Sequence, residues 1–225
     1  MEHILKKYKI EVNSNLYLKD PFSSDLGINI AKEGTSLIQE LGMENFTFRK
    51  LASKIGSTEA AIYRYFENKH KLLLYLSAWY WAWMEHNLVF ATANLKDPKE
   101  RLIVAIKLMV DGPIFTKNDY LDPLVLRRLV VDESLKGYLT KAVDNEHKNG
   151  IFAQVYKFGD RISHIIAEIN PDYEYPKTLV STVMESSLLQ SFNSQHLPGM
   201  TESSIGAKGR YKFFHQLVVN AISNE

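Results

Sequence analysis

Apolar residues recur at intervals of three and four along most of the chain, the pattern of helices that bury one face. No stretch alternates apolar and polar residues with a period of two, so no strand is predicted. Pairs such as Gly112-Pro113 and Asn170-Pro171 separate the periodic stretches. The sequence therefore predicts an all-α protein. The expected helices cover residues 26–41, 48–55, 59–66, 69–95, 99–110, 124–131, 135–146, 151–169, 176–192 and 205–222.

Residues 47–71 combine short helical segments with two tight breaks. Thr47, Thr58 and Asn68 are residue types that cap helix N-termini, and each precedes a helical segment. Gly56 supplies the turn between the first two segments. A short helix, a glycine turn and a second helix form the arrangement of a helix-turn-helix motif.

Positive charge gathers in this same stretch. It holds six Lys and Arg against two Asp and Glu, a local charge of +4, whereas the whole chain carries only +1. Cations directly follow two of the caps, at residues 49–50 and 69–71. A helix N-terminus disfavours a cation by about 0.3–1 kcal/mol. We expect an external polyanion, such as a phosphate backbone, to compensate both helix starts; a solvated basic face is the alternative.

At these residues the chain resembles the DNA-binding domain of the tetracycline-repressor (TetR) family of bacterial transcriptional regulators. The resemblance covers roughly residues 26–75, and its strength lies in the order of several elements rather than in one glycine turn. The matching elements are Gly42 after a first helix, Thr47-Phe48-Arg49-Lys50-Leu51-Ala52, Ile55-Gly56, Ile62-Tyr63-Arg64-Tyr65-Phe66-Glu67-Asn68-Lys69 and Leu72-Leu73.

The resemblance implies that residues 59–66 form the recognition helix, which enters the major groove. Tyr63 and Lys69 match the family's phosphate contacts, and Thr47 and Arg49 match contacts at the start of the preceding helix. Arg49 either pairs with guanine or touches phosphate only. The predicted DNA-binding residues are Thr47, Arg49, Thr58, Glu59, Ala60, Tyr63, Arg64 and Lys69.

Two positions leave the operator sequence open. Glu59 either accepts a hydrogen bond from cytosine or simply complements the helix dipole. Ala60 and Ala61 stand where family members often carry Gly or Pro and Thr, and neither has a hydrogen-bonding side chain. The base sequence read by this chain therefore does not follow from the family.

The chain divides into an N-terminal extension at 1–25, the helix-turn-helix domain at 26–75 and a larger helical domain at 76–225. The extension is not net basic, so it is more simply a short helix or passive arm than a minor-groove reader. There are no cysteines, no signal peptide and no run of 18 apolar residues. We expect a cytoplasmic protein with no membrane contact.

The helix from Lys69 is apolar nearly all round, so it should be buried in the second domain and link it to the first. Its tryptophans either belong to the hydrophobic core alone or also line a pocket. Family members generally hold a small molecule in this domain, which implies a small apolar or amphipathic effector. The candidate pocket residues are Trp79, Trp83, Phe115, Tyr120, Phe152, Tyr156, His164 and Phe192.

The last two predicted helices, at 176–192 and 205–222, carry apolar stripes. In the family such helices pair across a two-fold axis. A homodimer through them would place two recognition helices on one face of the duplex, whereas the alternative is an ordinary monomer core.

The sequence gives little support for a metal site or an enzyme active site. His164 and Glu168 share a helical face, but two residues make a poor metal site, so no metal and no cofactor is expected. No nucleophile elbow, zinc-protease motif or phosphate loop is present, so no enzyme is expected. We expect a homodimeric regulator of transcription that binds a double-stranded DNA operator, a repressor released by its effector. The alternative is a helical ligand-binding or interaction protein that has lost operator recognition.

Overall fold

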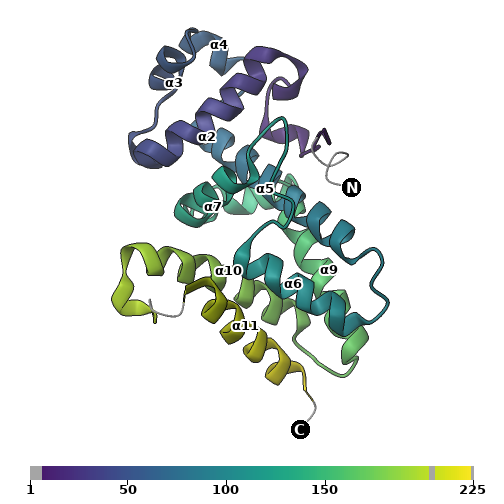
Figure 1. Cartoon of the computed structure of the whole chain (residues 1–225). Coiled ribbons are helices and arrows are strands. Elements are labelled where there is room, and N and C mark those ends of the chain that lie inside the picture. The colour runs from purple at the N-terminus through teal and green to yellow at the C-terminus, as the bar shows by residue number, and fades with distance from the viewer. Residues whose placement is uncertain (1–6, 203–205, 224–225) are drawn as a thin grey trace. The chain divides into compact units, whose positions relative to one another are not determined.

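The computed structural model describes residues 7–202 and 206–223, and within these ranges every regular element is a helix, so the all-α prediction is confirmed. Figure 1 labels the main helices along the chain. The elements are η1(Ser14–Leu16), η2(Pro21–Ser23), α2(Asp25–Asn45), α3(Phe48–Lys54), α4(Glu59–Tyr63), α5(Lys69–Thr92), α6(Pro98–Asp111), α7(Pro123–Tyr138), α8(Val143–Lys148), α9(Ala153–Ile169), α10(Pro176–His196), η3(Pro198–Met200) and α11(Gly206–Ile222).

The chain forms two compact units, each assembled from two separate segments. The first contains Met1–Trp83 and Phe115–Val155, and the second contains Met84–Ile114 and Tyr156–Glu225. The boundary falls inside two helices, α5 and α9.

In the first unit, α2 packs against α7 as well as against α3. Gly42 sits near the end of α2 with φ +73° and ψ 156°, a positive φ that favours glycine. The chain then runs on to Phe46, whose side chain is fully buried. The helix-turn-helix segment is therefore built onto the same core as α7.

In the second unit, α6, α10 and α11 pack against one another. Ser187 on α10 donates a 2.8 Å hydrogen bond to the carbonyl of Met109 on α6. Asn170, after α9, donates a 2.9 Å bond to the carbonyl of Ile222 at the end of α11. The first bond fastens α10 to α6, and the second fastens the end of α9 to the end of α11.

Several boundaries differ from the predicted ones. Helix α7 runs through Leu135 to Tyr138, so the predicted break before Leu135 is wrong. Helix α4 ends at Tyr63 rather than residue 66, and α10 continues to His196. Residue 205, where the last helix was expected to begin, lies outside the described residues, and α11 is described from Gly206.

The described part of the N-terminal extension is neither a long helix nor a detached arm. It contains two single-turn 3₁₀ helices, η1 and η2, and it buries Ile10, Leu16 and Phe22. Residues 1–6 lie outside the described part. No helix within residues 7–202 and 206–223 has the length and hydropathy needed to cross a membrane.

Candidate nucleic-acid interface

Side-chain caps begin the three helices that follow α2. The hydroxyl of Thr47 accepts a 3.2 Å hydrogen bond from the amide of Lys50, and that of Thr58 accepts one of the same length from Ala61. The Asn68 side chain accepts a 2.9 Å bond from the amide of Lys71. All three predicted caps are confirmed, and they fix where α3, α4 and α5 start.

Aromatic and aliphatic side chains fill the space between these helices. Gly34 on α2 allows a close approach, because a Cβ there would lie 3.2 Å from Cδ2 of Leu72 on α5. Ile55 is only half-buried. The buried residues of the group include Ile30, Ile38, Phe46, Phe48, Leu51, Ala61, Ile62, Tyr65, Phe66 and Leu72.

The opposite faces of α3 and α4 form one exposed surface, which we call the reading surface. Six of the eight predicted DNA-binding residues are exposed there: Thr47, Arg49, Thr58, Ala60, Tyr63 and Arg64. Glu59 is half-exposed. The structure thus brings these seven residues together on the two short helices. Lys69, half-exposed at the start of α5, reaches the carbonyl of Phe46, which directly precedes Thr47.

Tyr63 is held in place on this surface by packing. Its ring meets the buried ring of Phe48 edge to face, with 5.0 Å between centroids, and the residue remains 46% exposed. Thr47 and Thr58 use their oxygens as acceptors for the caps, so each hydroxyl proton is still available to donate. The surface therefore offers fixed hydroxyl donors, which suit phosphate oxygens.

Arg49 and Arg64 are the unengaged cations of the reading surface. Within the described residues neither guanidinium has an ion-pair or hydrogen-bond partner. Lys50, next to Arg49, donates a 2.8 Å bond to the carbonyl of Asn45, which leaves its charge uncompensated by a carboxylate. These three side chains can approach an anion without first breaking an ion pair.

The cations at the start of α5 are engaged within the protein, so the expectation that they await an external anion is wrong. The Lys69 ammonium donates to three carbonyl oxygens near the end of α2, those of Met43 at 2.7 Å, Phe46 at 3.1 Å and Glu44 at 3.3 Å. Carbonyls at a helix C-terminus have no partner inside their own helix, and a cation satisfies them. Lys69 therefore fastens α5 to α2, and its contact with DNA remains a prediction.

The next two residues of α5, His70 and Lys71, share one buried carboxylate. His70 Nε2 lies 3.0 Å and Lys71 Nζ lies 3.6 Å from Oε1 of Glu146 on α8. Lys54 at the end of α3 lies 3.4 Å from Glu33 on α2. Two of the six Lys and Arg of residues 47–71, Lys54 and Lys71, are therefore paired with carboxylates, and the cations of the reading surface are not.

Glu133 on α7 is a second buried carboxylate, and the sequence analysis did not identify it. Its Oε1 accepts a 3.0 Å bond from the amide of Met43, just after Gly42. Lys136 lies 2.6 Å from its Oε2 and 2.7 Å from Glu44. A charged residue inside the apolar pattern of α7 was the available signal, and it now explains how α7 holds the turn after α2.

The comparisons with known proteins agree with this geometry. A profile of the family described as "Bacterial regulatory proteins, tetR family" matches residues 30–76, which run from the first turns of α2 into α5. Over these residues the chain is similar to the TetR family. No curated protein sequence matches it.

Two solved structures resemble the chain over more than these residues. One is described as "Crystal structure of AibR in complex with isovaleryl coenzyme A and operator DNA", at 17% identity and a TM-score of 0.50 over 71% of this chain and 82% of that one. The other is "Crystal structure of apo AibR", at 18% identity and a TM-score of 0.46 over 72% and 83%. At this identity the first likeness concerns the fold alone.

The predicted effector residues of the first unit lie mainly in its core. Trp79 and Trp83 are fully buried and stacked, with centroids 5.7 Å apart. Trp83 donates a 2.9 Å bond to the carbonyl of Phe115, and Tyr120 packs on Phe22 with centroids 4.9 Å apart. The Trp79 indole N–H is buried without a hydrogen-bond partner among the described residues.

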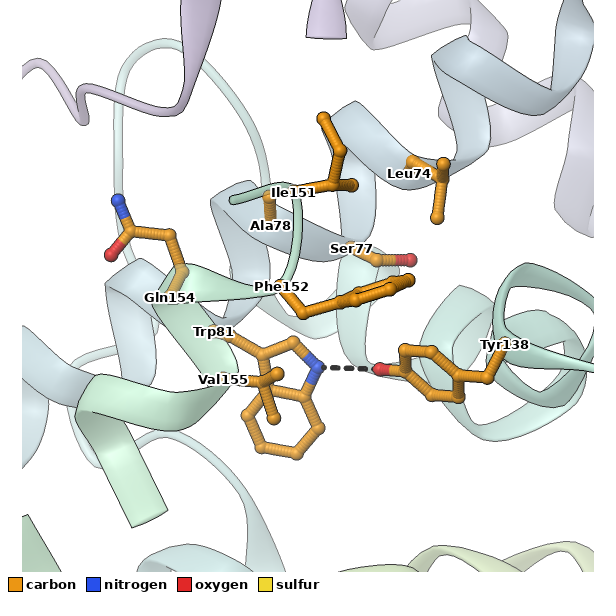
Figure 2. Close-up of a pocket in the computed structure, with 9 residues that line it drawn as sticks. All are labelled: Leu74, Ser77, Ala78, Trp81, Tyr138, Ile151, Phe152, Gln154 and Val155. Carbon is orange, nitrogen blue, oxygen red and sulfur yellow. Dashed lines mark hydrogen bonds between the residues drawn. The ribbon is translucent and has the colours of Figure 1, made fainter. Parts of the chain in front are cut away.

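Phe152, the fifth of these residues, lines a small pocket (Figure 2). Trp81 donates a 3.3 Å bond to the hydroxyl of Tyr138 across it, and the Phe152 ring lies 5.6 Å from that of Tyr138. The cavity measures about 10 Å³, enough for about one water molecule. In this state it cannot hold an effector. Its lining is Leu74, Ser77, Ala78, Trp81, Tyr138, Ile151, Phe152, Gln154 and Val155.

The predicted effector residues of the second unit are less buried. Tyr156 is about half exposed, His164 is exposed, and Phe192 packs on His196 with centroids 4.6 Å apart. Glu168, which was weighed with His164 as a metal ligand, is bound by both terminal nitrogens of Arg101. That hydrogen bonding lowers the pKa of the Glu168 carboxyl.

Helix α11 carries two apolar stripes. Phe214, Val218 and Ile222 are buried within the second unit. Phe213 and Leu217 are exposed at a spacing of four residues, which places both on one face of α11. The predicted stripe therefore splits into a face that is already covered and a face that is not.

Proposed function

We propose that this TetR-family regulator is a homodimeric repressor that binds an operator through α3 and α4 and is released by a small-molecule effector. The reading surface is the observation that carries the proposal. It presents Arg49 and Arg64 without internal partners beside the packed ring of Tyr63. Arginine pairs with guanine edges and with phosphate, and tyrosine and threonine hydroxyls bind phosphate oxygens.

We assign different roles within this surface. Thr47, Thr58 and Tyr63 would contact phosphate, since their hydroxyls are fixed by caps and by Phe48. Arg49 and Glu59 are the candidates for base readout. Ala60 is exposed on α4 and has no hydrogen-bonding side chain, so it would form no side-chain hydrogen bond to a base edge. It would leave room for an apolar contact with a thymine methyl.

The exposed stripe of α11 supports the homodimer. An apolar stripe at this spacing suits pairing with the same stripe of a second copy across a two-fold axis. One α4 of five residues covers few base pairs, and a two-fold dimer places the second reader about 34–36 Å away on the same face of the duplex. Leu189, exposed on α10, would extend the paired surface.

The effector part of the proposal draws on two observations. AibR, which shares the fold, was solved with isovaleryl coenzyme A and operator DNA. In the present chain, Trp79 keeps an unpartnered indole donor in the aromatic core along α5. A small apolar or amphipathic molecule with a hydrogen-bond acceptor could satisfy that donor, provided that the core opens to admit it.

Binding to DNA selected from a random duplex library would test the function. Duplexes of about 30 base pairs can hold two half-sites one helical turn apart. At a physiological ionic strength of about 0.15 M we expect enrichment of a palindromic sequence. The Arg49→Ala/Arg64→Ala variant should lose this enrichment, whereas Lys54→Ala should keep it, since Lys54 is paired with Glu33.

The opposite result would favour a ligand-binding or interaction protein. In that case the chain would retain no duplex at this ionic strength, or would retain every sequence equally and release all of them as salt rises. Either outcome would overturn operator recognition.

A further inference from the structure

Residues 7–24, which precede the family-matched region, form a folded segment that we call the N-terminal strap. Ile10 and Leu16 are almost fully buried, and Lys9 forms a 2.8 Å ion pair with Asp20. Pro21 lies so close to α2 that a Cβ on Gly27 would fall 2.2 Å from its carbonyl oxygen. The strap is therefore seated tightly against the first unit.

The middle of the strap is hydrogen-bonded to Tyr65, which lies just past the end of α4. The amide of Leu18 donates a 2.8 Å hydrogen bond to the carbonyl of Tyr65, two residues past the end of α4. The Tyr65 hydroxyl shares a 2.7 Å bond with the hydroxyl of Ser24. Lys19 donates to the same hydroxyl at 3.3 Å, and its ammonium lies 5.0 Å from the ring centroid. Tyr65 is thus fixed at its main chain, its ring and its hydroxyl.

The beginning of the strap is bound to the turn between α8 and α9. Asn13 and Asn15 both donate side-chain bonds to the carbonyl of Asn149, at 2.9 and 3.2 Å. Gln154 at the start of α9 donates a 3.0 Å bond to the carbonyl of Glu11. Gln154 also lines the small pocket described above (Figure 2). The strap therefore contacts the pocket wall and the end of α4 within the same unit.

Aromatic packing joins the two ends of the strap. The rings of Tyr17 and Phe22 meet the buried ring of Tyr75 on α5, with centroids 6.0 and 6.3 Å apart. Tyr75 in turn packs on Phe66, 5.2 Å away and next to Tyr65. A shift of the strap would disturb this cluster, because packed rings have few alternative arrangements.

We propose that the N-terminal strap sets the position of α4 through Tyr65 and couples it to the α8–α9 turn. The inference rests on the proposed function and adds a regulatory connection to the same reading surface. Helix α4 has five residues, too few to be stable alone, so its orientation depends on what holds its two ends. Thr58 fixes the first end and Tyr65 the second.

The strap differs from an arm that binds DNA. Two of its three lysines, Lys9 and Lys19, are engaged by Asp20 and by Tyr65. An arm in the minor groove presents free cations to the duplex. The strap instead uses its polar groups on its own protein, which makes its residues positioning residues rather than contacts.

A matched pair at one position tests the link to α4. Leu18→Pro removes the amide that binds Tyr65, and the extended backbone of Tyr17 (φ −144°, ψ 157°) suits a following proline. Leu18→Ala keeps the amide and loses only a side chain that is 67% exposed. We expect the proline variant to bind the library-selected duplex about three- to tenfold more weakly, the range for losing one hydrogen bond, and the alanine variant to bind like the unmodified chain.

Two further readouts separate positioning from contact or misfolding. Amide exchange of residues 59–65 should be faster in Leu18→Pro than in Leu18→Ala. The salt dependence of binding should keep its slope in both, since no phosphate contact is lost. A reduced slope would instead indicate a DNA-contacting arm and would overturn the proposal.

Tyr65→Phe provides a second route if the proline variant fails to fold. It removes the hydroxyl that binds Ser24 and Lys19 and keeps the buried ring. Tyr17→Phe is its control, because the Tyr17 hydroxyl has no hydrogen bond among the described residues. Equal exchange in residues 59–65 for these two variants would overturn the strap's role even if the chain bound no DNA at all.

The coupling to the α8–α9 turn is tested at its other end. Asn13→Asp keeps the cap of η1 but removes the amide donor to Asn149, and Asn15→Ala removes the second donor. The double variant should speed amide exchange of residues 59–65, although it touches no residue of α4. Exchange confined to residues 149–154 would overturn the coupling. Failure of the duplex selection alone would count against the proposed function, since these exchange measurements need no DNA.

Discussion

The ammonium of Lys69 donates a 2.7 Å hydrogen bond to the carbonyl oxygen of Met43, across 26 residues of sequence. It adds bonds to two more carbonyls of the same turn. Lys69, which is expected to contact phosphate, therefore also links α2 to α5.

Replacing Lys69 should accordingly destabilise the fold. Lys69→Ala leaves carbonyls at the end of α2 without their charged donor, and we expect a loss of about 2 kcal/mol in the free energy of unfolding. Lys50→Ala is the control, because its ammonium donates to one exposed carbonyl. Denaturant unfolding of both variants provides the measurement. Equal free energies of unfolding would show that the Lys69 hydrogen bonds add no stability.

Arg49→Ala should relax the preference at one base position in each half-site. Arg49 has no internal partner in the described structure, so its guanidinium is free to pair with guanine, a contact worth about 1–3 kcal/mol of discrimination. The measurement is a comparison of the duplex sequences selected by the variant and by the unmodified chain. If affinity falls equally for all sequences, Arg49 contacts phosphate rather than a base.

Phe213→Glu should convert the proposed homodimer into a monomer. The Phe213 side chain is 55% exposed on the uncovered face of α11, and a carboxylate there would have to lose its water on pairing. Ile103→Glu on α6 is the control, an exposed apolar residue outside the last two helices. Sedimentation at several concentrations measures the mass. A dimeric Phe213→Glu variant would place the interface elsewhere.

Two glycines inside helices should respond differently to alanine. Gly34→Ala would bring a Cβ to 3.2 Å from the buried Leu72 side chain, whereas the Cβ of Gly159→Ala would lie 3.8 Å from its nearest neighbours. Alanine normally stabilises a helix interior over glycine by about 1 kcal/mol. We expect that gain at Gly159 and its loss or reversal at Gly34. Equal shifts in melting temperature would mean that Leu72 moves aside freely.

The sequence was informative where a structure depends on near neighbours. Thr47, Thr58 and Asn68 cap the helices as predicted, because a cap needs only the two or three residues that follow it. The all-helical fold and the outward placement of Tyr63 also followed from local periodicity. These features are determined within a few helical turns.

The sequence was misleading where partners are distant. His70 and Lys71 looked uncompensated because Glu146 lies about 75 residues away along the chain. The polar residues before Leu135 suggested a break in α7, although Glu133 is buried there to receive the amide of Met43. Neither partner can be inferred from spacing, since the tertiary fold alone brings them together.

The bond from Leu18 to Tyr65 joins one main chain to another, so it does not depend on which side chain occupies position 18. Mutations could replace that residue by almost any amino acid other than proline without breaking it. Such a main-chain hydrogen bond is almost undetectable in a sequence alignment. In related proteins it would have to be recognised from the path of the backbone.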